Sequence, residues 1–299
     1  MATESLILSV FAAGCASTLD AQAEFRMKLH TIKKLFVQRD YLRIFTDASL
    51  LAAYVADYSP SRALAYRAML AASPSLSAAL LSPSASSINI YAIGAGSGAE
   101  LVAITTFVAE NRPPIQPSNH SANNSNINIT LHCQDIADYS SAIAPIRAAL
   151  AAKFNPSIFF ESSVFDILST ETVHIAEKTA RISAADFITA FFLLNELLAN
   201  SKRDFVTFVK LLVAEMKPGA LLVVVDSAGS FSEVEITTQS SSPSPSLSSS
   251  LASSKIKSTD SHDNHYKKKR ASSSSPVPQQ QQYSSSPTYM VYQLLDAIQ

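Results

Sequence analysis

Cysteine and glycine are both scarce in this chain of 299 residues, which has two cysteines and six glycines. Cys15 and Cys133 stand far apart with neither metal-ligand nor disulfide spacing, which fits a reducing compartment. None of the six histidines has a metal-binding spacing, and no Gly-x-Ser-x-Gly elbow occurs. Hydrolase and metalloenzyme functions therefore lack supporting residues, and we predict no metal site.

Long apolar runs and a large net charge are also missing. No stretch is long and apolar enough to span a bilayer, so we predict no membrane partner. Residues 6–16 are apolar, but Glu4 precedes them without any Lys or Arg, whereas a secretory signal begins with positive charge. The formal net charge is −1, so no global field draws the chain to nucleic acid. We expect a soluble intracellular protein, whose oligomeric state the sequence leaves open.

Residues 1–87 have helical spacing of leucine, alanine and charged residues, without strand-like alternation. Ser59 followed by Pro60 predicts a helix start, with serine as N-cap and a helix that runs to about Leu70. Between Arg26 and Arg67 eight basic residues stand against only Asp40, Asp47 and Asp57, which indicates either solvated helix faces or a surface that faces a polyanion. These basic residues are Arg26, Lys28, Lys33, Lys34, Arg39, Arg43, Arg62 and Arg67.

Residues 88–236 alternate apolar, strand-like segments with helical ones, which predicts a parallel sheet covered on both faces. The expected strands are residues 88–93, 127–134, 158–161, 186–193 and 220–226. The expected helices begin near Ala99, Ser141, Glu171 and Asp204. The fold class is therefore α/β.

Residues 237–288 are dominated by serine, proline and glutamine and have no pattern that forms a core, so we predict disorder. The basic cluster Lys267–Arg270 inside this insert is typical of a nuclear-import signal, a weak nucleic-acid contact or a solubilising charge run. The last apolar segment, residues 289–299, fits one helix or one strand.

Three of the six glycines fall in the window Gly94–Gly98, directly after an expected strand and before an expected helix. Glycine permits positive φ and close backbone approach, and a helix start presents bare N–H groups, so the window predicts a nucleotide-like ligand. Gly94-x-Gly96-x-x-Ala99 fits dinucleotide sites, whereas Gly94-x-Gly96-x-Gly98 fits S-adenosylmethionine sites. Either match alone is weak.

Acidic residues follow the next two strands. Asp135 ends the second strand, where a carboxylate faces ribose hydroxyls, and Asp166 follows the third, where it suits an exocyclic amine such as N6 of adenine. This order favours S-adenosylmethionine over a dinucleotide, whose acid lies only about 20 residues past the glycines. Alternatively, each aspartate caps a helix.

Asn195 and Glu196 follow the fourth strand, at the sheet edge that borders the ligand crevice. An amide and a carboxylate there are suited to orient a substrate base and to accept its proton. Alternatively, both residues cap the next helix. Asp226 begins a further polar turn at the same edge.

The chain resembles the fungal 25S ribosomal RNA uridine-N3 methyltransferases, a group within the class I S-adenosylmethionine-dependent methyltransferases. The resemblance covers roughly residues 20–236 and 289–296, and its most specific parts are Ser59–Tyr66 and Asn195–Leu197. It rests on the stretches YLRIF, LLAAYVADYSPSRALAY, GAGSGAELVAI, QDIADYS, FLLNEL and LLVVVDSAGSFSEV.

The resemblance implies a Rossmann-like, mostly parallel sheet with an N-terminal helical extension, and ribosomal RNA or a pre-ribosomal particle as partner. It implies a nuclear or nucleolar location for this RNA modification, with the cytoplasm as alternative. S-adenosylmethionine would be held by Gly94, Ala95, Gly96, Gly98, Asp135, Ile136, Asp166 and Ile167. Asn195 and Glu196 would lie near the transferred methyl, with Glu196 assisting deprotonation. Arg62, Tyr66, Lys33 and Lys34 would contact RNA.

Two departures from the family pattern stand out. Ala92 occupies the position, two residues before the first glycine, where methyltransferases often carry an acid, so the contact to the cofactor's amino group must come from elsewhere. Related proteins continue past the position of Gln299 into further strands, so we expect the C-terminal hairpin of the sheet to be missing. Alternative functions are a methyltransferase of a protein or small molecule and a non-catalytic module that keeps the fold.

Overall fold

The computed structural model describes residues 3–81, 87–111, 128–154 and 158–226. All of these residues belong to one unit of the chain, Met1–Phe231. The predicted disordered insert, its basic cluster and the last apolar segment lie outside the described residues, as does the question of a C-terminal hairpin.

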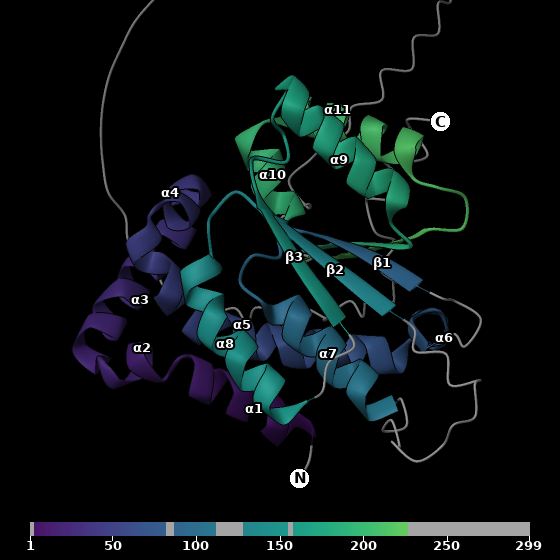
Figure 1. Ribbon diagram of the computed structural model, residues 1–299. Helices are drawn as coiled ribbons and strands as arrows, with labels where there is room; N and C mark the ends of the chain where they lie inside the picture. The colour runs from purple at the N-terminus through teal and green to yellow at the C-terminus, as the bar shows by residue number, and fades with distance from the viewer. Residues whose placement is uncertain (1–2, 82–86, 112–127, 155–157, 227–299) are drawn as a thin grey trace, which may run out of the picture. The chain divides into compact units, whose positions relative to one another are not determined.

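Five apolar segments form one parallel sheet with the strand order β3-β2-β1-β4-β5 (Figure 1). Every strand pair is parallel, which confirms the predicted α/β class. The carboxyl ends of all strands therefore lie at one edge of the sheet. The strands are β1 Ser87–Ile93, β2 Asn128–Asp135, β3 Ile158–Val164, β4 Phe187–Phe191 and β5 Leu221–Val225.

Helices cover both faces of the sheet, because the strands carry apolar residues on both sides. Helices α9 and α11 lie over one face, and α1, α5, α7 and α8 lie over the other (Figure 1). The helices that follow the strands are α7 Ala99–Asn111, α8 Ser140–Lys153, α9 Thr172–Ala184, α10 Leu194–Asn200 and α11 Lys202–Glu215.

The predicted end of the fourth strand is wrong. β4 stops at Phe191 because Phe192 adopts a positive φ of 54°, which an extended strand cannot contain. The next residues then form α10, a short helix that the sequence analysis did not separate from the strand. β3, in contrast, runs three residues past its predicted end, to Val164.

The N-terminal region is helical, as predicted. Its helices are α1 Thr3–Gly14, α2 Ala16–Asp20, α3 Gln22–Val37, α4 Tyr41–Thr46, α5 Ala48–Ala72 and α6 Pro74–Leu81. Among the described residues no single helix is long and apolar enough to cross a membrane. Only together do α5 and α6 have the length and apolar composition of a span, and the chain bends by 92° between them.

The predicted helix start at Pro60 is wrong, because α5 runs through this residue without a break. Inside a helix, proline cannot bond the carbonyl four residues earlier and its ring crowds that carbonyl, and the packing of α5 against its neighbours offsets this cost. Ser59 is fully buried and, instead of capping a helix, its Oγ donates to the backbone carbonyl of Ser97 at 3.0 Å. Asp47 is the N-cap, accepting from the N–H of Ser49 at 3.0 Å.

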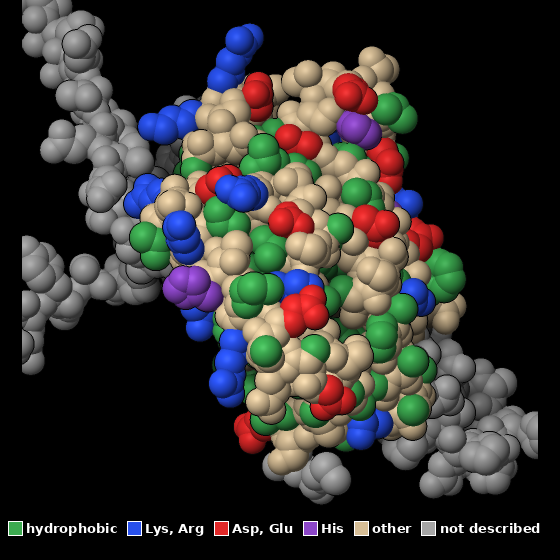
Figure 2. Space-filling model, turned by 90° about the vertical axis from the view of Figure 1, so that its left-hand side faces the viewer, with side chains coloured by type: hydrophobic (Ala, Val, Ile, Leu, Met, Phe, Trp, Pro, Cys, Tyr) green, Lys and Arg blue, Asp and Glu red, His purple; other side chains and the backbone are tan. Residues whose placement is uncertain are grey.

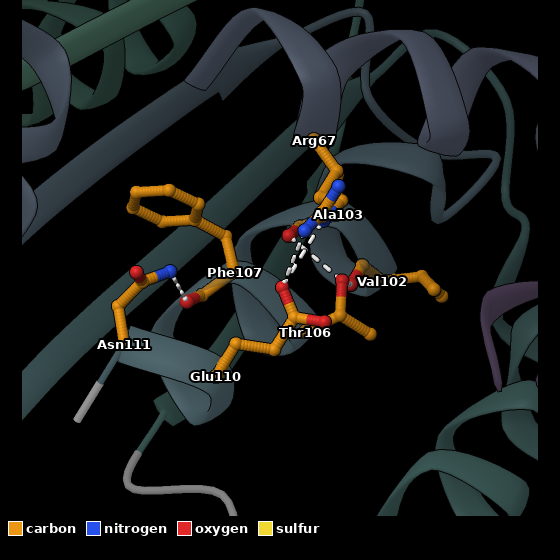
Figure 3. A network of polar contacts seen from close by, with 7 residues as sticks. All are labelled: Arg67, Val102, Ala103, Thr106, Phe107, Glu110 and Asn111. Atoms are coloured by element: carbon orange, nitrogen blue, oxygen red, sulfur yellow. Dashed lines mark hydrogen bonds and ion pairs between the residues drawn. The ribbon is translucent and has the colours of Figure 1, made fainter. Parts of the chain in front are cut away.

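Helix α5 packs along α7, and polar contacts fix this pairing at both ends. Near one end lies the bond from Ser59 to Ser97 in the glycine loop. Near the other end, Arg67 forms a 2.8 Å ion pair with Glu110 of α7, beside the Thr106 hydroxyl that bonds within the same helix (Figure 3). The register of α5 against the sheet's carboxyl edge is therefore defined.

Gly14 lies at the contact between α1 and α8. A Cβ atom at this position would lie 2.7 Å from the Cα of Ile146 and 2.9 Å from its backbone nitrogen. Both neighbouring atoms belong to the backbone, so relief requires the two helices to separate.

We expect Gly14→Ala to lower the free energy of unfolding by about 1–3 kcal/mol, the usual cost of overpacking. Denaturant unfolding of the two proteins measures this change. Ala13→Ser adds one atom at an exposed position of the same helix and is the control. A Gly14→Ala protein as stable as the wild type would show that the helices separate at no cost.

Candidate active site

A cavity of about 250 Å³ opens at the carboxyl edge of the sheet. Residues from the ends of β1, β2, β3 and β4 line it, together with α5 and the α3–α4 turn. Of the residues predicted from the sequence, those that line the cavity are Arg62, Gly94, Asp135, Ile136, Asp166, Ile167 and Glu196. The structure thus brings seven predicted residues to one place. Ala95, Gly96, Gly98 and Asn195 adjoin the cavity in sequence but are not part of its lining.

The glycine loop follows β1 and is tied to β2. The N–H groups of Gly94 and Ala95 donate to the carbonyl of Gln134 at 2.8 and 3.1 Å. Gly94 and Gly98 have φ values of +68° and +80°, which other residues rarely adopt. At Gly96 the requirement is space, because a Cβ would lie 2.8 Å from the Cβ of Asp135 and would collide with the Tyr139 ring.

Asp135 and Asp166 each lie in a tight turn of the chain, and each carboxylate accepts hydrogen bonds from backbone N–H groups. Asp135 accepts from the N–H of Gly96 at 2.9 Å and from that of Ala137 at 3.1 Å. Asp166 accepts from the N–H of Leu168 at 2.9 Å. Neither aspartate is a helix N-cap, because the N-caps of α8 and α9 are later residues, so the capping alternative is wrong.

Lys178 of α9 forms hydrogen bonds to the loop after β3. The sequence did not indicate this residue. Its ammonium group donates to the carbonyl of Ile167 at 2.9 Å and to that of Ser169 at 2.7 Å. The side chain is only 4% exposed, and burial lowers its pKa below the ordinary lysine value. A buried cation that bonds two carbonyls fixes the loop that carries Asp166 and Ile167.

Asn195 and Glu196 lie inside the first turn of α10, and neither side chain caps it, so the capping alternative is wrong here too. The Asn195 side-chain amide donates to Asp226 at 2.6 Å, and the Asn195 N–H donates to the same carboxylate at 3.2 Å. This contact ties α10 to the end of β5. Glu196 faces the cavity, and burial raises its carboxyl pKa to about 8, against the lowering effect of Arg62.

Arg62 enters the cavity from α5 through a group of aromatic rings. Its guanidinium donates to the hydroxyl of Tyr54 and lies 5.4, 5.8 and 5.1 Å from the ring centres of Tyr54, Tyr58 and Phe192. Tyr66, one turn later, is only 3% exposed and packs 4.4 Å from the Phe191 ring. The predicted RNA contact of Tyr66 is therefore incompatible with its burial in this structure, because the core encloses its ring.

Glu100 is a further acid that the sequence analysis missed. It lies in the first turn of α7 and is 3% exposed, and burial raises its carboxyl pKa to about 7. Burial likewise raises the pKa of Asp135 to about 6, against the effect of the N–H groups it accepts. Arg62 lowers the pKa of Glu100, Asp135 and Glu196 alike, so all three acids share one buried cation.

Two non-glycine residues of the described chain have positive φ, Arg39 at 56° and Phe192 at 54°. Both line the cavity although they lie far apart in the sequence, because Arg39 belongs to the α3–α4 turn and Phe192 follows β4. Such conformations cost energy and concentrate at functional sites. No local sequence signal marks either residue.

The predicted RNA contacts Lys33 and Lys34 are exposed on α3 and do not line the cavity. Arg39 and Arg43, also exposed, follow in the next turn and in α4. Figure 2 views the side that carries these helices and shows Lys and Arg side chains gathered along its left-hand edge. Arg67, in contrast, is paired with Glu110. Among the described residues no cluster of His, Cys, Asp or Glu has the arrangement of a metal site.

Comparison with known proteins agrees with this geometry. Residues 11–245 match a family described as "Putative SAM-dependent methyltransferase". The chain belongs to this family. It is also 26% identical over 226 residues to a protein of Saccharomyces cerevisiae named 25S rRNA (uridine(2843)-N(3))-methyltransferase. The match covers 70% of this chain and 60% of the length of that relative.

The buried carboxyl of Glu100 makes stability depend on pH. Its pKa is raised to about 7 from an ordinary value of 4.5, so the folded state retains a proton that the unfolded state has lost. The contribution of this group to stability is therefore present below pH 4.5 and is lost as the pH rises through 7. The melting temperature of Glu100→Gln minus that of the wild type should be larger at pH 8 than at pH 5, because only the wild type loses stability when Glu100 ionises. A difference that is the same at both pH values would contradict this assignment.

Lys178 provides a test of the loop after β3. We expect Lys178→Met to weaken binding of S-adenosylhomocysteine, the product form of the family's cofactor, on the order of tenfold, equivalent to about 1.4 kcal/mol. Methylthioadenosine, which lacks the amino-acid portion, should lose affinity by the same factor. Calorimetry measures both, and Lys210→Met at an exposed position of α11 is the matched control. Unchanged affinities in a folded Lys178→Met protein would show that the loop keeps its shape unaided.

Proposed function

We propose that this protein transfers a methyl group from S-adenosylmethionine to N3 of a uridine in large-subunit ribosomal RNA. The observation that carries the proposal is that one cavity is lined by Gly94, Asp135 and Asp166 and also by Glu196 and Arg62. The first group suits the cofactor, and the second suits a nucleobase. Family membership supports the reaction type, and the name of the yeast relative supports the target.

The residues of the first group fit S-adenosylmethionine. The absence of a side chain at Gly96 lets Asp135 and Tyr139 pack directly against the glycine loop, which brings the Asp135 carboxylate beside the loop's N–H groups. We assign the loop Gly94–Gly98 to the methionine portion, Asp135 and Ile136 to the ribose, and Asp166 and Ile167 to the adenine. The bound cofactor supplies a methyl group on a positively charged sulfur.

Glu196 is the base in this mechanism. The imide N3 of uridine is a poor nucleophile while it holds its proton. In the proposed step the proton passes from N3 to a carboxylate oxygen of Glu196, N3 forms the bond to the methyl carbon, and the electrons of the broken carbon–sulfur bond remain on sulfur. A general base works best with a pKa near the working pH, and burial raises the pKa of Glu196 to about 8.

Asn195 contributes to this step by positioning Glu196. Its two hydrogen bonds to Asp226 hold the first turn of α10 against the end of β5, which places Glu196 at the cavity. We therefore assign Asn195 a positioning role in place of the direct contact to the base that the sequence suggested.

Most of the proposed RNA contacts lie outside the cavity. Lys33, Lys34, Arg39 and Arg43 are exposed on α3, α4 and the turn between them, and of these four Arg39 also lines the cavity. Basic side chains in this position bind phosphates of an RNA whose target base enters the cavity. The proposed partner is ribosomal RNA or a pre-ribosomal particle, in the nucleus or nucleolus, with the cytoplasm as alternative.

The proposal is tested by incubating the purified full chain with tritiated cofactor and ribosomal RNA from cells that lack the native enzyme. We expect N3-methyluridine in digests of the wild-type reaction. Glu196→Gln should lower kcat by about 10²–10⁴-fold while keeping affinity for S-adenosylhomocysteine, because only the proton acceptor is lost. With wild type, kcat/KM should rise as the pH rises through about 8, where Glu196 loses its proton.

Two further variants separate the parts of the site. Asp135→Ala should abolish cofactor binding, and neutralising Lys33 and Lys34 should weaken RNA binding and reduce its dependence on salt. Methyl transfer to a protein or small molecule, insensitive to salt and to these lysines, would favour the alternative substrates. A folded protein that binds S-adenosylhomocysteine but methylates no ribosomal RNA would refute the proposed target.

A further inference from the structure

Contacts hold the guanidinium of Arg62 in place, but most of its N–H donors have no hydrogen-bond acceptor among the described residues. Three aromatic rings surround it, and among the described residues it makes one hydrogen bond, to the hydroxyl of Tyr54. A guanidinium has five N–H donors, so most of its donors remain for a ligand. Because it lines the cavity, those donors are available to a molecule bound there.

Arg62 forms no ion pair with the nearby acids of the described chain. Its charge lowers the pKa of Glu196, Glu100 and Asp135. Yet within the described part of the chain no carboxylate oxygen lies within 4.0 Å of the guanidinium to form an ion pair with it. The base Glu196 and the cation Arg62 therefore line one cavity without forming an ion pair with each other.

A separated base and cation distinguish between two classes of nucleobase nitrogen. An imide N–H, as in uracil, loses its proton during methylation, and negative charge spreads over the ring nitrogen and the adjacent carbonyl oxygens. An exocyclic amine, as in adenine or cytosine, instead gains positive charge as it attacks. A buried cation stabilises the first transition state and destabilises the second, and low polarity strengthens both effects.

We propose that Arg62 is a catalytic, specificity-determining residue whose guanidinium donates to a carbonyl oxygen of the target base as that base becomes an anion. The site then accepts the imide class of nucleobase and rejects exocyclic amines. This inference rests on the proposed function and adds a role for Arg62 inside the cavity, where the sequence suggested an RNA contact. Tyr54 is a positioning residue that holds the guanidinium.

The test uses two RNA substrates that differ only in the acidity of the target imide. Fluorine at C5 withdraws electrons from the uracil ring and makes N3–H more acidic, so its anion needs less stabilisation. We expect Arg62→Gln to lower kcat on uridine RNA about 10²–10³-fold, the usual loss of one donor to a developing anion. On 5-fluorouridine RNA the loss should be at least about tenfold smaller. Arg62→Lys, which keeps the charge, should recover part of the rate.

Controls separate this role from folding and from RNA binding. Affinity for S-adenosylhomocysteine should be unchanged in Arg62→Gln, which reports an intact cofactor site. Arg203→Gln removes an exposed arginine of α11 that does not line the cavity and should leave both rates unchanged. An equal loss on both RNAs in Arg62→Gln and Arg62→Lys would overturn the assignment. Wild-type protein that methylates neither RNA would instead refute the proposed function, and with it the role of Arg62.

Discussion

The seating of α5 against the glycine loop is the contact on which the site depends. The fully buried hydroxyl of Ser59 bonds the carbonyl of Ser97, so the helix has one register relative to the sheet edge. One turn later this register turns Arg62 toward the cavity, and the next turn pairs Arg67 with Glu110. The N-terminal helices therefore form a wall of the site and are not an accessory to a complete sheet domain.

The N-terminal helices also bury the acidic residues of the site. Covering the strand ends removes water from Glu100, Asp135 and Glu196, and burial is the main reason that their pKa values rise. At neutral pH Asp135 is ionised and Glu100 is partly ionised, so their negative charge exceeds the single positive charge of Arg62 even while Glu196 holds its proton. This balance favours a ligand that brings positive charge. A cofactor with a sulfonium and an ammonium group provides it. We propose that this negative charge takes the place of the acid that alanine at position 92 does not supply.

Features set by neighbouring residues could be predicted from the sequence. Alternation of apolar strands and helices gave the parallel sheet, and the carboxyl ends of parallel strands share one edge, so Asp135, Asp166 and Glu196 were expected together. The start at Pro60 and the end of β4 were predicted wrongly, because both follow from packing against distant residues. Phe192 adopts a positive φ that no local signal marks.

The sequence alone thus determined the fold class, the glycine loop and the acids at the strand ends, because short-range geometry and periodicity dictate them. Only the tertiary structure decided which polar residues are buried and what they face. Lys178 holds the loop after β3, Glu100 joins the acids around Arg62, and Tyr66 belongs to the core. Burial and electrostatic coupling depend on residues far apart in the chain, and a one-dimensional pattern does not contain those distances.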